Sequence, residues 1–192
     1  QWISTVKGDL FRIAEWYGWT GKSNQGLRML ATEVAEGIVE REIQLGIYGR
    51  VQPGPADNSI NDVDNGKSIA TDMAKVVKLE RKRYKGVTWT RSDKNPGSRK
   101  AGWKQIRQAL KDALPQEMKR EDGSVVNVPR DKPGLFVFNT CTMFVELFPI
   151  APRDEKDPDD IDTDSEDHIA DEVRYKVLST NIGVRGGRTT GM

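Results

Sequence analysis

The sequence has few residues that bind soft metals or form disulfides. Its 192 residues include one cysteine and one histidine. A single Cys141 excludes an internal disulfide framework, and it also excludes zinc ribbons and clusters held by several thiolates, because those thiolates are absent. A metal ion bound to this chain would therefore have to be held mainly by carboxylates.

Long hydrophobic runs are also missing. No apolar run approaches the roughly 20 residues that a membrane-spanning helix needs, and the first residues do not follow the order of a secretory signal. We therefore expect no membrane partner. Five Trp, five Phe and four Tyr can anchor a core, so disorder along the whole chain is not expected. The length suits one α/β domain, or one domain with an appendage.

The net charge is only +1, because two blocks of opposite sign cancel. Residues 75–107 hold twelve Lys or Arg and two acids, a local net charge of +10, and residues 154–172 hold eleven acids and one Lys, a local net charge of −10. The basic block also contains Trp89 and Trp103, a composition typical of a surface that binds a polyanion. Charge alone equally fits a solvated helix surface beside a solvated loop.

Hydrophobic spacing indicates a chain of alternating short elements. Apolar residues three and four apart predict helices over residues 27–45, 68–79, 98–114, 142–148 and 166–178. Alternating or short apolar runs predict strands over residues 1–6, 10–19, 47–51, 86–90 and 135–138. A polar connection is expected over residues 115–132. A hairpin followed by helices and short strands is typical of an α/β protein with a mixed sheet.

The strongest local group of chemically active residues lies near the start of the last predicted helix. Asp167 and Asp171 are four residues apart and share one helix face, with His168 beside them. Ile169 and Val173 are expected to point into a core. Like charges at this spacing cost a few tenths of a kcal/mol unless a cation lies between them. The alternative is a plain acidic first turn, which the helix dipole stabilises.

A second carboxylate from another element would be needed to hold a hard divalent ion, and Asp57 is the best candidate. It follows Pro53-Gly54-Pro55-Ala56, which excludes a regular central strand, so Asp57 is expected at a strand end or in the loop beyond it. Carboxylate and water ligands favour Mg²⁺ or Mn²⁺. Two such ions can activate a water and stabilise the leaving oxygen in phosphodiester hydrolysis.

Several motifs together are familiar from one family. They are Gly54-Pro55-Ala56-Asp57, Ser98-Arg99-Lys100-Ala101-Gly102-Trp103, Pro133-Gly134-Leu135-Phe136-Val137-Phe138-Asn139-Thr140-Cys141, Asp157-Pro158-Asp159-Asp160-Ile161-Asp162-Thr163 and Asp167-His168 with Asp171-Glu172-Val173-Arg174-Tyr175. With this spacing, residues 8–178 resemble the C-terminal nuclease domain of the large terminase subunit of tailed bacteriophages.

The resemblance implies an RNase H-like fold, an α/β architecture in which a mixed β-sheet is flanked by helices on both faces. It would span residues 1–180, with residues 181–192 as a flexible basic tail and the first, central strand upstream of residue 1. The resemblance also implies a two-metal Mg²⁺ or Mn²⁺ site. Asp57, Asp167 and Asp171 would be the catalytic metal ligands and His168 a further candidate ligand; which residue of the last helix is the main ligand stays open.

The implied activity is metal-dependent endonuclease cutting of concatemeric viral DNA in the cytoplasm of the host cell. The implied partners are double-stranded DNA, the portal and the small terminase subunit, and the isolated domain is expected to be monomeric. Within the basic block, the residues expected to contact DNA phosphates are Lys94, Arg99, Lys100, Lys104 and Arg107. Two alternatives stay open: a catalytically incomplete module that docks to DNA or the portal, and another RNase H-like nuclease of the resolvase or integrase type.

Overall fold

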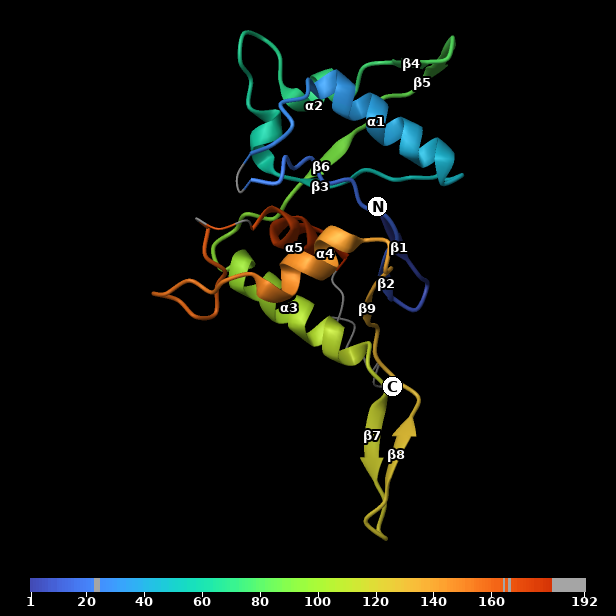
Figure 1. Cartoon of the computed structure of the whole chain (residues 1–192), viewed down its shortest axis with the longest axis vertical. Coiled ribbons are helices and arrows are strands. Elements are labelled where there is room, and N and C mark those ends of the chain that lie inside the picture. Colours follow the sequence, from blue (N-terminus) through green and yellow to red (C-terminus); the bar gives the residue numbers. More distant parts are fainter. Residues whose placement is uncertain (23–24, 164, 166, 181–192) are drawn as a thin grey trace, which may run out of the picture. The chain divides into compact units, whose positions relative to one another are not determined.

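The computed structural model describes residues 1–22, 25–163, 165 and 167–180 (Figure 1). Two compact units make up the chain: unit 1 contains residues Gln1–Tyr17 and Asp93–Met192, and unit 2 contains residues Gly18–Ser92. The predicted basic tail, residues 181–192, lies outside the described residues, and the strand expected upstream of residue 1 stays a prediction.

Unit 1 is built around a small mixed sheet. Its elements are β1 (Trp2–Ser4), β2 (Leu10–Arg12), α3 (Ser98–Asp112), β7 (Gln116–Lys119), β8 (Val125–Val128), β9 (Leu135–Val137), α4 (Thr142–Leu147), a 3₁₀ helix (Phe148–Ile150) and α5 (His168–Thr180). The strand order is β1-β2-β9, in which β2 pairs antiparallel with β1 and parallel with β9. Unit 1 thus has a small mixed sheet of three strands, in which β2 lies between β1 and β9.

One face of this sheet carries the core of unit 1. Leu10 and Leu135 are register partners on neighbouring strands and are completely or almost completely buried. Ile106 of α3 and Val173 of α5 belong to the same buried cluster. Because side chains alternate along a strand, Phe11 and Phe136 lie on the opposite face, where their rings stack with centroids 4.9 Å apart. The described structure thus shows a mixed α/β protein, and the RNase H-like layering stays a proposal.

The polar connection expected over residues 115–132 forms the antiparallel β7–β8 hairpin instead. Gly123 takes a positive φ of 84° at its turn, and the Asp122 carboxylate accepts a hydrogen bond from the Ser124 amide at 2.8 Å. Its strands bury almost no side chains, and Met118 is half exposed. The hydrophobic pattern is weak here because the hairpin has no core face to bury.

Unit 2 packs one long helix against short elements. Its elements are α1 (Ala31–Gln44), β3 (Gly54–Ala56), a 3₁₀ helix (Asn58–Asn61), α2 (Ile69–Met73), β4 (Val77–Leu79), β5 (Lys82–Tyr84) and β6 (Trp89–Arg91). β3 pairs parallel with β6, and β4 pairs antiparallel with β5. The buried residues Ala35, Val39, Met73 and Val77 form its core.

Two expectations for unit 2 are wrong. The helix predicted over residues 68–79 ends at Met73, because Val77 and Leu79 follow the two-residue period of a strand and face the core from β4. The strand predicted over residues 47–51 is a turn, in which Gly46 and Gly49 have positive φ values of 66° and 78°. Among the described residues, no helix is both long and apolar enough to cross a bilayer.

Candidate functional site

The candidate site of unit 1 begins where the acidic loop meets α5. Asp167 directly precedes the helix, and its carbonyl oxygen accepts the first-turn hydrogen bond from the Asp171 amide at 2.9 Å. Ile169 and Val173 are buried in the core, as the sequence predicts. This anchoring fixes the rotation of the first turn and so places the carboxylates of Asp167 and Asp171 on a face away from that core.

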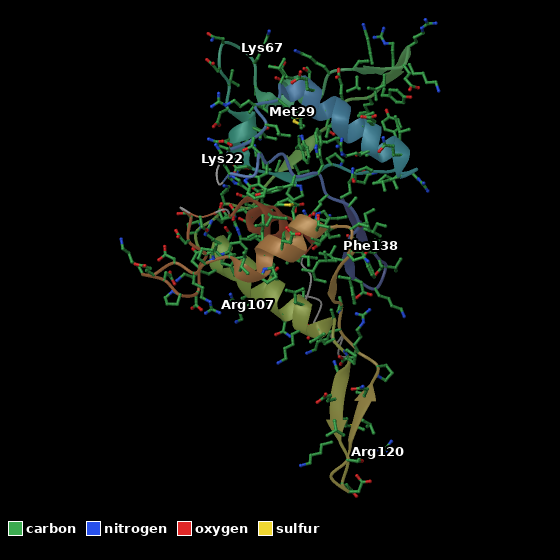
Figure 2. All side chains as sticks on the ribbon, in the orientation of Figure 1. Lys22, Met29, Lys67, Arg107, Arg120 and Phe138 are labelled. Atoms are coloured by element: carbon green, nitrogen blue, oxygen red, sulfur yellow. The ribbon has the colours of Figure 1, made fainter. Side chains whose placement is uncertain are left out.

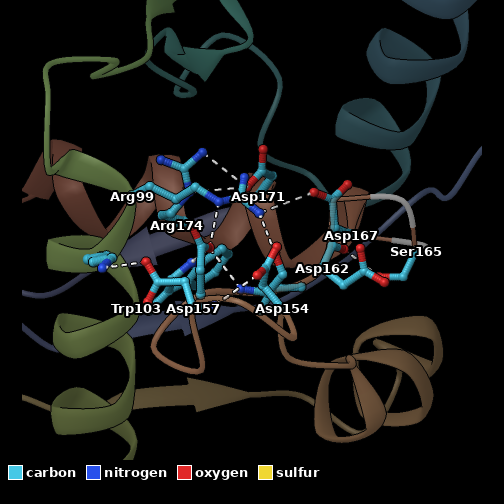
Figure 3. A network of polar contacts seen from close by, with 12 residues as sticks. Arg99, Trp103, Asp154, Asp157, Asp162, Ser165, Asp167, Asp171 and Arg174 are labelled. Carbon is cyan, nitrogen blue, oxygen red and sulfur yellow. Dashed lines mark hydrogen bonds and ion pairs between the residues drawn. The ribbon is translucent and has the colours of Figure 1, made fainter.

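A guanidinium group from another element lies among these carboxylates (Figure 3). Arg99, in the first turn of α3, donates from Nη1 to Asp171 Oδ1 at 3.3 Å and from Nη2 to Asp167 Oδ2 at 3.5 Å. Its Nε donates to Asp160 Oδ1 at 2.6 Å, and Nη2 also donates to the Ile161 carbonyl at 3.0 Å. One arginine therefore bridges three carboxylates from the acidic loop and α5.

Asp160 is also held by a second side chain of α3. The indole nitrogen of the buried Trp103 donates to the same Oδ1 atom at 2.7 Å. Burial alone would raise the pKa of Asp160, but the hydrogen bonds from Trp103 and Arg99 outweigh it, and the pKa is lowered. Asp160 thus stays ionised and ties the acidic loop to α3.

Asp171 is held from its own helix as well. Arg174 donates to Asp171 Oδ1 from Nε at 3.1 Å, and its Nη2 lies 3.0 Å from the same oxygen. The hydroxyl of Tyr175 donates to Asp171 Oδ2 at 3.0 Å. With Arg99 included, three side chains donate to this carboxylate. Arg174 and Tyr175 were not among the predicted site residues, although their spacing of three and four residues from Asp171 was a usable signal.

Asp167 has a different environment. Burial raises its pKa, the nearby charge of Asp171 raises it further, and Arg99 opposes both effects. The Nδ1 atom of His168 lies 3.8 Å from Asp167 Oδ1, and the imidazole is mostly exposed. Asp167 therefore combines partial burial with a like charge directly beside it.

Asp57 lies in unit 2, directly after β3, as predicted for a strand end. Its carboxylate accepts a hydrogen bond from the Ser59 amide at 2.9 Å. Because β3 and β6 are parallel, the residues after their carboxyl ends gather at one edge, and Asn58 Nδ2 donates to the Ser92 carbonyl at 3.3 Å. The buried oxygens Asn58 Oδ1 and Ser92 Oγ have no hydrogen-bond partner in the described structure.

The side-chain oxygens of these residues are the kind of ligand that a hard divalent cation prefers. Asp57 directly precedes Asn58, whose buried Oδ1 has no hydrogen-bond partner in the described structure, and Asp167 lies beside the like-charged Asp171. In the part of the chain that the structure describes, no group of three His, Cys, Asp or Glu side chains is close enough to hold a metal ion. Asn58 and Ser92 were not singled out in the sequence. Ser92 directly follows β6 and Asn58 is the second residue after β3, so a position just beyond a strand end was the available signal.

The five predicted phosphate contacts differ in their surroundings. Arg99 bridges the carboxylates described above, and Lys100 Nζ lies 2.5 Å from Asp157 Oδ2. Lys94 Nζ lies 5.1 Å from the centre of the Tyr175 ring. Lys104 and Arg107 are exposed on α3, and neither pairs with an acid within the described residues. Arg99 and Lys100 thus hold the acidic loop, whereas Lys104 and Arg107 face solvent.

Comparison with known proteins adds no assignment, since no protein family, curated protein or solved structure matches this chain.

Proposed function

We propose that the chain is the metal-dependent DNA endonuclease domain of a viral genome-packaging terminase, with an RNase H-like fold. The observation that carries the proposal is the pair of carboxylates at the start of α5. Asp167 is partly buried next to Asp171, and the pKa of Asp167 is raised by burial and by that neighbouring charge. Repulsion between two neighbouring ionised carboxylates destabilises the folded protein. A bound divalent cation would offset that repulsion.

The proposed ligands divide between the two units. Asp57 would bind Mg²⁺ or Mn²⁺ from unit 2, together with the free oxygens of Asn58 and Ser92. From α5, Asp167 would be the main ligand, because three side chains already donate to Asp171. His168 is exposed beside Asp167 and could add a nitrogen ligand.

The remaining side chains would have supporting roles. Arg174 and Tyr175 hold the Asp171 carboxylate in one orientation, and Trp103 and Arg99 hold Asp160. The bound metals would activate a water and offset charge on the scissile phosphate. The proposed setting is the packaging motor in the host cytoplasm, where the partners would be double-stranded DNA, the portal and the small terminase subunit.

A plasmid-nicking assay tests this proposal. We expect the full chain to nick supercoiled DNA with Mn²⁺ and not with EDTA, and we expect Asp57→Asn and Asp167→Asn each to lower the rate at least about 100-fold. Asp62→Asn is the matched control, because it removes an exposed charge from the same loop as Asp57 and should leave the rate unchanged. Nicking that survives EDTA or the Asp167→Asn change would contradict the metal site.

One observation favours a second candidate, a module that docks to DNA or the portal without cutting. Arg99 and Lys100 already neutralise the acids of the loop at Asp160 and Asp157. An acidic surface satisfied from within the protein needs no metal to be stable. Wild-type protein that binds DNA but never nicks it, with either Mg²⁺ or Mn²⁺, would support this second candidate.

A further inference from the structure

The β4–β5 hairpin of unit 2 is a short, exposed and strongly basic element. Residues 78–85 hold five Lys or Arg and one acid, a net charge of +4. The cations are Lys78, Arg81, Lys82, Arg83 and Lys85, and all are exposed. Figure 2 shows nitrogen-ended side chains extending outward from this hairpin. Among the described residues none of these five side chains has an acidic partner.

The two faces of the hairpin have opposite character. Val77, Leu79 and Tyr84 belong to or pack against the core of unit 2. Lys78 and Arg83 are register partners and therefore lie side by side on the other face. Like charges directly opposite one another destabilise a sheet, so this arrangement does not serve the stability of the fold.

The turn of the hairpin is also unfavourable for the residues that form it. Glu80 and Arg81 have positive φ values of 46° and 67°, which glycine or asparagine would adopt at lower cost. The base of the hairpin is firmly held, since the Tyr48 hydroxyl accepts a hydrogen bond from the Lys85 amide at 2.8 Å. The Tyr48 and Tyr84 rings also meet edge to face. The hairpin is therefore a fixed support that presents cations at its outer face and tip.

We propose that the outer face and tip of the β4–β5 hairpin bind the phosphate backbone of duplex DNA without reading its sequence. Complementary charge favours a polyanion, and phosphate contacts from Lys and Arg need no particular base. Tyr84 packs inward, and the outer face carries no aromatic side chain, so the hairpin is no stacking platform for single strands. The choice of DNA over RNA rests on the function proposed above, whereas the binding requires neither the carboxylates nor a metal.

The test is a salt titration of binding to a fluorescent DNA duplex of random sequence, done with the full chain in EDTA. We expect Lys78→Gln/Arg83→Gln to make the slope of log K against log salt shallower by about 1.8, because each lost phosphate contact removes about 0.9. The matched control is Lys119→Gln/Arg120→Gln, which removes two exposed cations from the β7–β8 hairpin and should leave the slope unchanged.

Several results would overturn the proposal. An unchanged slope in the β4–β5 variant would do so, and so would an equal change in the control. Hairpin-dependent binding to phosphatidylserine vesicles without binding to the duplex would assign the surface to a membrane instead. If the double variant melts below the wild type, Arg81→Gln at the tip replaces it, with an expected slope change of about 0.9.

The outcome is separable from that of the nicking assay. Hairpin-dependent binding in a protein that never cuts DNA would support the hairpin surface and contradict the endonuclease. Metal-dependent cutting with binding that is insensitive to the β4–β5 variant would support the endonuclease and contradict the hairpin surface.

Discussion

Replacing Arg99 by glutamine would test whether this arginine stabilises unit 1 by neutralising the acids around it. The substitution keeps an amide donor and removes the charge that bridges Asp160, Asp167 and Asp171. Because Asp167 directly precedes α5 and Asp171 lies in its first turn, their repulsion would then be opposed on α5 mainly by Arg174. We expect the variant to be less stable at neutral pH.

The size of the loss follows from the contacts. Two of the hydrogen bonds are well formed, to Asp160 at 2.6 Å and to the Ile161 carbonyl at 3.0 Å, and two are longer, at 3.3 and 3.5 Å. Bonds to charged groups contribute about 1.5–3 kcal/mol each in favourable cases. The Arg99 side chain is 26% exposed, so water screens part of this. We expect a loss of about 2–3 kcal/mol, below the 3–5 kcal/mol of a fully buried pair.

The loss should depend on pH in a defined direction. The folded protein raises the pKa of Asp167 above its unfolded value, so its ionisation costs stability as the pH rises through the folded pKa, and the cost is absent below the unfolded pKa. Arg99 opposes that rise, so removing it enlarges the cost at neutral pH and leaves it absent in acid. The part of the gap due to Asp167 should therefore shrink as the pH falls toward the unfolded pKa of aspartate, about 4, whereas the part due to Asp160, whose pKa is lowered, should persist to lower pH.

Urea denaturation at several pH values measures this gap. Arg107→Gln on the same helix is the control, because Arg107 is exposed and should change the stability by less than about 0.5 kcal/mol. An Arg99→Gln loss that is equal at pH 4 and pH 7.5 would refute the electrostatic reasoning and point to packing against the Trp103 ring. If the proposed metal site exists, millimolar Mn²⁺ should restore more stability to the variant than to the wild type.

Two further predictions concern the fold that supports the site. Gly102→Ala on α3 would place a Cβ atom 2.4 Å from Cγ of the buried Arg174. The overpacking cost of about 1–3 kcal/mol should outweigh the helix-propensity gain of about 1 kcal/mol, so we expect a less stable protein. A higher melting temperature would contradict this. Asp9 accepts hydrogen bonds from Arg130 at 2.6 and 2.9 Å, and chiefly these lower its pKa. Its stabilisation is present above the unfolded pKa and is lost as the pH falls through the folded pKa. Asp9→Asn should therefore cost about 1–2 kcal/mol at pH 7 and progressively less as the pH falls below the unfolded pKa. A deficit independent of pH would count against this prediction.

Long amphipathic segments were the most predictable part of this fold. The helix predicted over residues 98–114 is α3, and the one predicted over residues 166–178 is α5, because each has a clear apolar face that meets a core. The prediction of one helix over residues 68–79 was wrong. A short helix and a strand follow one another there, and their hydrophobic spacings together resemble that of a single helix. The β7–β8 hairpin was unpredictable from hydrophobic pattern, because neither of its faces is buried.

The candidate site was predictable in its acids and not in its cations. Asp57, Asp167 and Asp171 could be chosen from local spacing and strand-end position, and the structure describes all three in the expected local settings. Whether they come together to hold a metal stays a prediction, because Asp57 belongs to unit 2 and the others to unit 1.

Counting charge along the chain could not tell which cations are available to a partner. Residues 75–107 sum to +10, but the block crosses from unit 2 into unit 1 and has two different roles. Arg99 and Lys100 form ion pairs with acids that are more than fifty residues away in the sequence. The cations of β4–β5 are held apart from acids by a hairpin whose register places Lys78 opposite Arg83. Ion pairs between residues far apart in the sequence decide which cations are available to a partner. Local sequence therefore favoured Arg99 as a phosphate contact, although this arginine bridges several carboxylates.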